Sequence, residues 1–384
     1  MALPKPILLE PNLQPRPYRG GSRLAAFRGL GTAPGERYPE DWIGSVTKVM
    51  QSDEAGLSRL PGGTTLRDAV ESDPASYLGP EHVAILGAST GLLVKVIDAQ
   101  QRLSIHVHPD RSFARRYVGS PFGKTEAWYV LETASVDAAM YFGFSEIIDP
   151  DTLLTTVESG HGGALLERMN RVPVKRGDAL FVPAGTPHAI GEGILLVEVQ
   201  EPSDLLVRLE WAGYAVGDMR NDLGLGFMTA LSAVDRSPWD IDRMADVRAH
   251  ASMDKELVSL LPRGAGHFFR LDAASISARL TLPQMFGIVI AVAGSGSLLS
   301  DSTELSVHTG DAILVPWSAG EVDLTGNLSI VVCRPPDPVQ VVQADPDLTS
   351  WLRTTEPAGS QTEGSFVDTT NRSSGQDPQL KSTK

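Results

Sequence analysis

Residues 103–128 read LSIHVHPDRSFARRYVGSPFGKTEAW, and this stretch decides how the rest of the chain is interpreted. His106 and His108 are two positions apart, so in a strand both imidazoles point to the same side. Pro109 follows and favours a turn, because proline has no N–H to donate to a strand ladder. We therefore expect a short strand over residues 103–107 that presents two imidazoles on one face.

Glu126 begins the next β-prone segment, which continues Ala-Trp-Tyr-Val-Leu. We predict a second strand that folds back against the first and brings this carboxylate to the two imidazoles. Imidazole and carboxylate groups that converge from neighbouring strands suit zinc or another divalent first-row metal. The alternative interpretation places one histidine in the core and the other on the surface.

The composition bounds the class of protein. A chain of 384 residues with 42% hydrophobic and 21% charged residues is long enough for two globular domains, or for one large all-β unit with additions. The net charge of −14 argues against a general nucleic-acid-binding protein, which would normally carry a basic face. It leaves a phosphorylated small molecule open, because such a site needs only one or two well-placed basic residues.

Targeting and redox signals are sparse. No apolar run approaches the roughly 20 residues of a membrane span, so we expect no membrane partner. The N-terminus lacks the apolar core of a secretory signal. The single cysteine, Cys333, excludes an intramolecular disulfide, which fits a cytoplasmic protein.

A repeat organises the rest of the chain. The block GDALFVP at residues 177–183 returns as GDAILVP at residues 310–316. His188 follows the first aspartate by ten residues, whereas Glu321 occupies that place after the second, and the second unit has no H-x-H pair. The repeat predicts a second small barrel of the same design without a metal site.

The strand rhythm gives the expected domain plan. Residues 1–211 form the metal-binding domain, and within it residues 128–131 and 137–142 pair as a hairpin. A bridge of short helices over residues 212–262 leads to the second barrel at residues 263–345. The polar tail, residues 346–384, is expected to be disordered.

Three segments taken in order resemble type I mannose-6-phosphate isomerases of the cupin superfamily, in their short bacterial form. They are LSIHVHPD (103–110), FGKTEAWYVL (122–131) and GDALFVPAGTPHAIGEGILLVEVQEPSDLLVRLEW (177–211). The resemblance covers residues from about 5 to 340. It implies a mainly β fold of two cupin, jelly-roll-like barrels with a few short helices, the second barrel being degenerate. It also implies zinc-dependent interconversion of mannose 6-phosphate and fructose 6-phosphate through a cis-enediol.

The resemblance also assigns residues. It implies zinc ligands at His106, His108, Glu126 and His188, with Mn²⁺ or Fe²⁺ as alternative metals. Lys124 matches a lysine that contacts the substrate, and Arg208 matches an arginine beside the reacting carbons. The general base and the phosphate contacts are left open. Candidates for the base are Glu198, Glu201 and Glu210, each with a surface or structural role as the alternative. Candidates for the phosphate are Arg19, Arg111, Arg115 and Arg116, each with a solvent-exposed side chain as the alternative.

The sequence also departs from the family at three points. His106 stands where the family usually has glutamine, Leu205 replaces an asparagine close to Arg208, and Arg19 replaces the tryptophan of a Trp-Gly-Gly motif. A set of three histidines and one glutamate is also used by cupin oxygenases for iron or manganese. Two alternatives therefore stay open: a metal-dependent cupin acting on another sugar or with oxygen, and a non-catalytic regulator that binds sugar phosphate. The assembly is expected to be a monomer or a homodimer.

Overall fold

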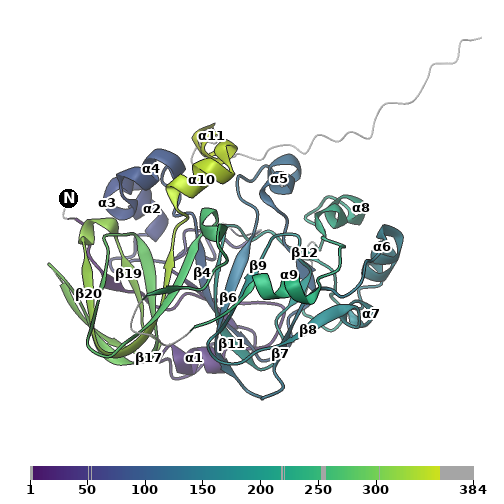
Figure 1. Cartoon of the computed structure of the whole chain (residues 1–384), viewed down its shortest axis with the longest axis horizontal. Helices are drawn as coiled ribbons and strands as arrows, with labels where there is room; N and C mark the ends of the chain where they lie inside the picture. Colours follow the sequence, from purple (N-terminus) through teal and green to yellow (C-terminus); the bar gives the residue numbers. More distant parts are fainter. Residues whose placement is uncertain are drawn as a thin grey trace, which may run out of the picture.

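The computed structural model describes residues 3–50, 52, 54–217, 219, 221–251, 257–301 and 303–354. It consists of two β-rich lobes side by side, with helices over one end and along the outer side (Figure 1). The mainly β fold predicted from the sequence is confirmed. None of the helices in these ranges is long and apolar enough to cross a membrane.

The first lobe contains two sheets. The larger has seven strands in the order β13-β9-β6-β11-β4-β3-β2. The smaller has five strands in the order β12-β5-β10-β7-β8. The bounds of the larger sheet are β2 Leu13–Gln14, β3 Glu40–Ile43, β4 Leu93–Ala99, β6 Glu126–Thr133, β9 Asp178–Val182, β11 Ile194–Gln200 and β13 Arg248–His250. Those of the smaller are β5 His106–Val107, β7 Ala139–Phe144, β8 Met169–Pro173, β10 His188–Ala189 and β12 Val207–Arg208.

The predicted pairing of neighbouring segments is wrong in two places. Strand β6 pairs with β11 and β9, whereas β7 pairs with β10 and β8, so they do not form the expected hairpin. Residues 134–138 instead carry the chain from one sheet to the other. Strand β5 likewise lies in the opposite sheet from β6, because helix α5 (Arg111–Phe113) and a π-helical turn (Ala114–Val118) separate them.

The seven-stranded sheet is buried on both faces. Along β4 all seven residues are buried, and alternate side chains point to opposite faces. Lys95 and Ile97 line a pocket between the two sheets of the first lobe. Val94 and Val96 point the other way, into the core cluster that also contains Ile288 and other residues of the second lobe. One sheet therefore serves as pocket wall and as interface between the lobes.

The second lobe is an eight-stranded sheet with the order β1-β19-β17-β20-β15-β14, to which β16 and β18 add at β20 and β17. Its own core includes side chains of the long paired strands β17 and β20, among them the fully buried Leu298 and Leu324. The bounds are β1 Ile7–Leu8, β14 Val258–Ser259, β15 Arg270–Ile276, β16 Arg279–Leu282, β17 Gly287–Ser300, β18 Thr303–His308, β19 Ala312–Val315 and β20 Val322–Arg334.

Three segments cross the boundaries drawn from the sequence. Strand β1, near the N-terminus, pairs with β19 of the second lobe, with Ile7 opposite Leu314. The segment predicted as a helical bridge holds the short helices α8 (Phe227–Ala230) and α9 (Ile241–Asp246). It also gives strand β13 to the first lobe and strand β14 to the second.

Most of the remaining helices pack over one end of the lobes. Helices α4 and α11 share a small core in which Leu86 and Leu348 are buried. The expectation of disorder is therefore wrong for residues 346–354, because they form helix α11 and bury Leu348. Residues 355–384 lie outside the described residues. The bounds are α1 Ser22–Phe27, α2 Leu66–Ser72, α3 Pro74–Leu78, α4 Pro80–Leu86, α6 Pro150–Glu158, α7 Gly163–Leu166, α10 Pro338–Ala344 and α11 Pro346–Thr354.

Candidate metal centre

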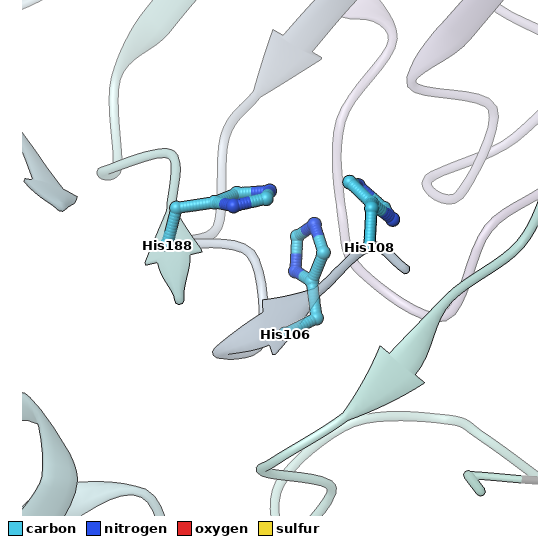
Figure 2. A group of neighbouring side chains, drawn as sticks. All are labelled: His106, His108 and His188. Atoms are coloured by element: carbon cyan, nitrogen blue, oxygen red, sulfur yellow. The ribbon is translucent and has the colours of Figure 1, made fainter. Parts of the chain in front are cut away.

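Three histidines meet in the pocket of the first lobe. His106 and His108 come from strand β5 and the residue after it, and His188 opens the neighbouring strand β10, directly opposite His106. Their rings point toward one another (Figure 2). One nitrogen from each ring lies within 4.8 Å of the others, and all three side chains are buried. The structure thus brings together the three imidazoles that the sequence singled out.

The protein fixes the tautomer of each imidazole. Nδ1 of His106 donates to the carbonyl oxygen of Ser104 at 2.7 Å, Nδ1 of His108 to that of Leu205 at 2.7 Å, and Nδ1 of His188 to that of Thr186 at 2.8 Å. A carbonyl oxygen only accepts, so Nδ1 carries a proton, and in the neutral ring Nε2 is the nitrogen that presents a lone pair. Hydrogen bonds of this kind are what orient metal-binding histidines.

Glu126 faces these rings from the opposite sheet. It is the first residue of β6 and is 1% exposed. Its two carboxylate oxygens lie 3.2 Å from Nε2 of His108 and 3.2 Å from Nε2 of His188. The predicted convergence is therefore present, but across the gap between two facing sheets instead of along adjacent strands.

The protonation states suit metal binding. Burial lowers the pKa of the His106 imidazole far below its usual range, and burial together with the Lys124 ammonium lowers that of His108 to about 3. Burial alone would raise the pKa of Glu126, but Lys124 and the imidazoles outweigh it and hold that pKa well below the usual range. Neutral imidazoles and an ionised carboxylate are the forms that bind a metal.

The contact between His188 and Glu126 tests whether a metal fits. Nε2 of His188 is buried and has no hydrogen-bond partner among the described residues. In the neutral ring this nitrogen carries a lone pair that faces a carboxylate oxygen 3.2 Å away, so two acceptors would approach each other. A cation bound by both groups would satisfy them, and the three imidazoles with one carboxylate form a nitrogen and oxygen donor set suited to a first-row divalent metal.

Lys124 and Arg208 border this centre. The Lys124 ammonium lies 2.6 Å from Nε2 of His108 and 2.7 Å from a carboxylate oxygen of Glu126. Arg208 sits on β12 opposite His106 in the strand pairing, and its Nη1 donates to the side-chain oxygen of Asn221 at 2.9 Å. No carboxylate in the described residues lies within ion-pair distance of Arg208, and burial, with repulsion from Arg16, lowers its pKa to about 10.

The three candidate bases are in different surroundings. Glu198 lines the pocket, is held by Lys95 at 2.7 Å, and has its pKa raised by burial and by the nearby Glu126. Glu201 instead pairs with Arg111 and accepts from a backbone N–H. Glu210 pairs with a different arginine outside the pocket lining. Only Glu198 of these three borders the centre.

The arginines considered for the phosphate lie elsewhere. Arg111 and Arg115 pair with Asp345 of the second lobe, Arg116 lies over the ring of Tyr117, and Arg19 is exposed. None of the four is among the described residues that line the pocket. The expectation that one of them contacts the substrate in this pocket therefore has no support.

The pocket contains basic and acidic side chains that the sequence did not single out. They are Arg16, Glu40, Lys95 and Asp204. Glu40 and Lys95 lie on β3 and β4, and their alternating positions in buried strands were the available signal, because a charge inside an apolar strand needs a partner. Leu205 gives its carbonyl to His108, whereas its side chain lines a neighbouring cavity.

The second lobe has no comparable group. Glu321, which takes the place of His188 in the repeat, is exposed. Within the described ranges, the one set of histidine, cysteine and acidic side chains close enough to share an ion is that of His106, His108 and His188.

A two-sheet barrel with histidines and a glutamate converging inside it defines a metal-binding cupin. Comparison with known proteins narrows the class. Residues 18–132 match the model of the type I phosphomannose isomerase catalytic domain, and residues 265–335 that of the mannose-6-phosphate isomerase cupin domain. The mannose-6-phosphate isomerase ManA of Bacillus subtilis (strain 168) is 31% identical over 335 residues, which are 85% of this chain and 98% of that protein. The chain therefore belongs to the type I mannose-6-phosphate isomerase family, as its motifs indicated.

Further relatives agree. A mannose-6-phosphate isomerase of Streptococcus mutans is 28% identical over 336 residues, 85% of this chain and 97% of that protein. The crystal structure of a mannose 6-phosphate isomerase from Bacillus subtilis superposes with a TM-score of 0.65 at 25% identity, covering 86% of this chain and all of that one. A putative mannosephosphate isomerase from Archaeoglobus fulgidus, with a TM-score of 0.68 at 20% identity over 87% of this chain and 99% of that one, shows the same fold.

Proposed function

We propose that this protein is a zinc-dependent aldose–ketose isomerase that interconverts mannose 6-phosphate and fructose 6-phosphate. The observation that carries the proposal is that His106, His108, Glu126, Lys124, Glu198 and Arg208 border one pocket. His188 completes the histidine cluster beside it. Family membership supports the same reaction, because the relatives named above are mannose-6-phosphate isomerases.

Isomerisation moves a proton between C1 and C2 of the open-chain sugar through a cis-enediol. In our proposal His106, His108, His188 and Glu126 hold the metal, which would supply Lewis-acid stabilisation of charge on the substrate oxygens. Arg208 provides a fixed positive charge for the same oxygens. Lys124, which borders Glu126, is placed to bind a sugar hydroxyl or to carry a proton.

Glu198 is our candidate for moving the proton between the two carbons. Its carboxylate accepts from the indole N–H of Trp128 at 3.2 Å and lies 2.7 Å from the Lys95 ammonium, so its position is fixed. Burial and Glu126 raise its pKa toward the range in which a carboxylate exchanges protons efficiently near neutral pH. An acid–base group of this kind contributes roughly 10²–10⁴-fold to a rate.

The test is a coupled assay of mannose 6-phosphate conversion on protein stripped with chelator and reloaded with zinc, manganese or iron(II), with bound metal measured in each sample. Restoration by zinc is the expected result, as is loss of at least about 100-fold in His188→Ala and Arg208→Ala. His250→Ala, which changes a half-exposed histidine on β13, is the matched control and should keep full activity.

The opposite result would be a folded, metal-loaded protein without turnover. Oxygen consumption by the iron form would then favour an oxygen-dependent cupin reaction, for which the third imidazole at His106 is the supporting feature. Binding of mannose 6-phosphate without conversion would favour a regulatory protein.

We further propose a cytoplasmic location and a monomeric or homodimeric state. Cys333 is a free, buried thiol, which is compatible with a reducing compartment. Sedimentation velocity on the metal-loaded protein tests the assembly.

A further inference from the structure

We infer that Arg16 binds the phosphate group of the sugar phosphate. This inference rests on the proposed function. Arg16 was not among the arginines considered from the sequence, yet its side chain lines the pocket that contains the metal centre.

The Arg16 side chain is held rigidly. Pro15 and Pro17 flank it and restrict the backbone to extended conformations. Its Nε donates to a carboxylate oxygen of Glu40 at 2.8 Å, and its guanidinium lies over the Trp42 ring at 4.8 Å from the centroid. The side chain is 9% exposed. A cation fixed in this way loses little conformational entropy when it binds a ligand.

One end of this guanidinium has no acceptor. Nη2 of Arg16 is buried and makes no hydrogen bond within the described residues. A carboxylate oxygen of Asp204 lies 3.8 Å from this Nη2, beyond hydrogen-bond distance. The other oxygen of Asp204 accepts from the backbone N–H of Met50. Buried N–H groups are nearly always paired, so this one points to an acceptor supplied by a ligand.

Arg208 shows the same deficiency. Its Nε is buried without a hydrogen-bond partner in the described part of the chain. Both guanidinium groups line the same pocket, and repulsion from Arg16 contributes to lowering the pKa of Arg208. Arg208 lies opposite His106 in the strand pairing, next to the metal centre.

Arg16 approaches the pocket at a distance from Glu126. Glu126 lies on β6, and in the seven-stranded sheet β11, β4 and β3 follow in order away from it. Arg16 contacts Glu40 on β3, three strands from Glu126, which corresponds to about 14 Å between backbones. The reacting carbons C1 and C2 lie at the opposite end of the hexose from the phosphate on C6. A metal at one end and Arg16 toward the other would therefore orient the sugar.

The charge of the pocket fits a dianion. Its described lining has four basic side chains and four acidic ones, which balance. A bound divalent metal adds two positive charges. A phosphate monoester carries about −1.5 to −2 at pH 7, so its binding would restore neutrality. The charged lining residues are Arg16, Lys95, Lys124, Arg208, Glu40, Glu126, Glu198 and Asp204.

The experiment compares phosphorylated and unphosphorylated ligands in the zinc-loaded enzyme. Arg16→Gln should raise KM for mannose 6-phosphate about 10- to 100-fold, the loss of a charge-assisted hydrogen bond, and change kcat less than about threefold. The inhibition constant of inorganic phosphate should rise in parallel, and the affinity for mannose should stay the same. Arg16→Lys should recover part of the phosphate affinity, because the ammonium keeps the charge without the fixed planar donors.

Arg19→Gln is the matched control. It removes an exposed arginine three residues away and should leave both affinities unchanged. Because Arg16→Gln also leaves Glu40 without its closest cation, Arg16→Gln/Glu40→Gln removes that buried charge as well. The loss of phosphate affinity should persist in this double variant.

Equal effects on mannose and on mannose 6-phosphate, or no effect on either, would overturn the inference while leaving the isomerase proposal intact. Calorimetric titration with mannose 6-phosphate and with inorganic phosphate separates the two proposals. If the wild-type protein binds these ligands without turnover, the isomerase proposal fails, and a weaker affinity in Arg16→Gln still supports phosphate binding by Arg16.

Discussion

The ion pair between Arg111 and Glu201 allows a sharp test of how buried charges support the metal centre. Arg111 follows the His-Val-His-Pro-Asp segment, and its Nε lies 2.6 Å from a carboxylate oxygen of Glu201. The Glu201 side chain is 1% exposed. The other oxygen of Glu201 accepts from the backbone N–H of Thr125, the residue before Glu126. Arg111 also reaches Asp345 of the second lobe at 3.1 Å.

Arg111→Met removes the positive charge and keeps much of the side-chain volume. Glu201 would then be a buried carboxylate with one backbone partner, whereas Asp345 would keep its ion pair with Arg115. Removing one partner of a buried pair costs about 3–5 kcal/mol, because the other charge is left uncompensated. We expect a loss of this size in the free energy of unfolding, measured by urea denaturation of the metal-loaded protein, together with weaker metal binding.

The double variant Arg111→Met/Glu201→Gln decides whether this reasoning is right. A neutral amide still offers an oxygen to the N–H of Thr125, so at least about 2 kcal/mol of the loss should return. Arg115→Met is the control, because Asp345 retains Arg111, and it should cost less than about 1 kcal/mol. A destabilisation below 1 kcal/mol in Arg111→Met, or a double variant no more stable than the single one, would refute the argument.

Three further predictions concern other sites. His106→Gln should weaken zinc binding at least tenfold, since even the loss of an outer-shell partner costs about 10–100-fold in metal affinity. Competition with a chromophoric chelator measures this affinity, and an unchanged value would remove His106 from the ligand set. Burial lowers the pKa of His82 to about 4, so the folded protein favours the neutral imidazole. Its contribution to the free energy of unfolding should be fully present above pH 6.5, and about 3 kcal/mol should be lost as the pH drops through 4. His82→Asn should lack that part of the fall in acid denaturation, and an identical pH profile would contradict this assignment. Gly123→Ala would place a Cβ 2.6 Å from a backbone carbon of Asp110. We expect this substitution to lower the free energy of unfolding by more than about 2 kcal/mol. The control is Gly163→Ala, whose Cβ would meet nothing within 4 Å and which should be neutral in the same assay.

The groups at the metal centre were predictable where local rules apply. The i, i+2 spacing of His106 and His108 fixed a common direction, and the strand start at Glu126 followed from β propensity. His188 came from a resemblance to a family motif, because no local rule connects residues 80 positions apart. That these residues bind the metal stays a prediction.

Longer-range features could not be predicted in the same way. Whether β6 pairs with β5 or faces it depends on the helical segment between them, which sends the chain to the other sheet. Arg16 and Lys95 approach the pocket through the order of strands in the sheet, and a single sequence does not specify that order. Helix α11 was missed because its stability depends on burying Leu348 against α4, a tertiary contact that overrides a polar composition.

The pairing of β1 with β19 has a consequence for how the chain folds as it is synthesised. Ile7 leaves the ribosome early, but its partner Leu314 follows 307 residues later. At 5–20 residues per second the delay is roughly 15–60 s, during which the first strand of the chain has no partner. A fragment ending before β19 would therefore carry an unpaired N-terminal strand, and a chain lacking its first ten residues would leave β19 as an open sheet edge prone to association. Strand β1 can therefore join its sheet only late in synthesis, after β19 has been made.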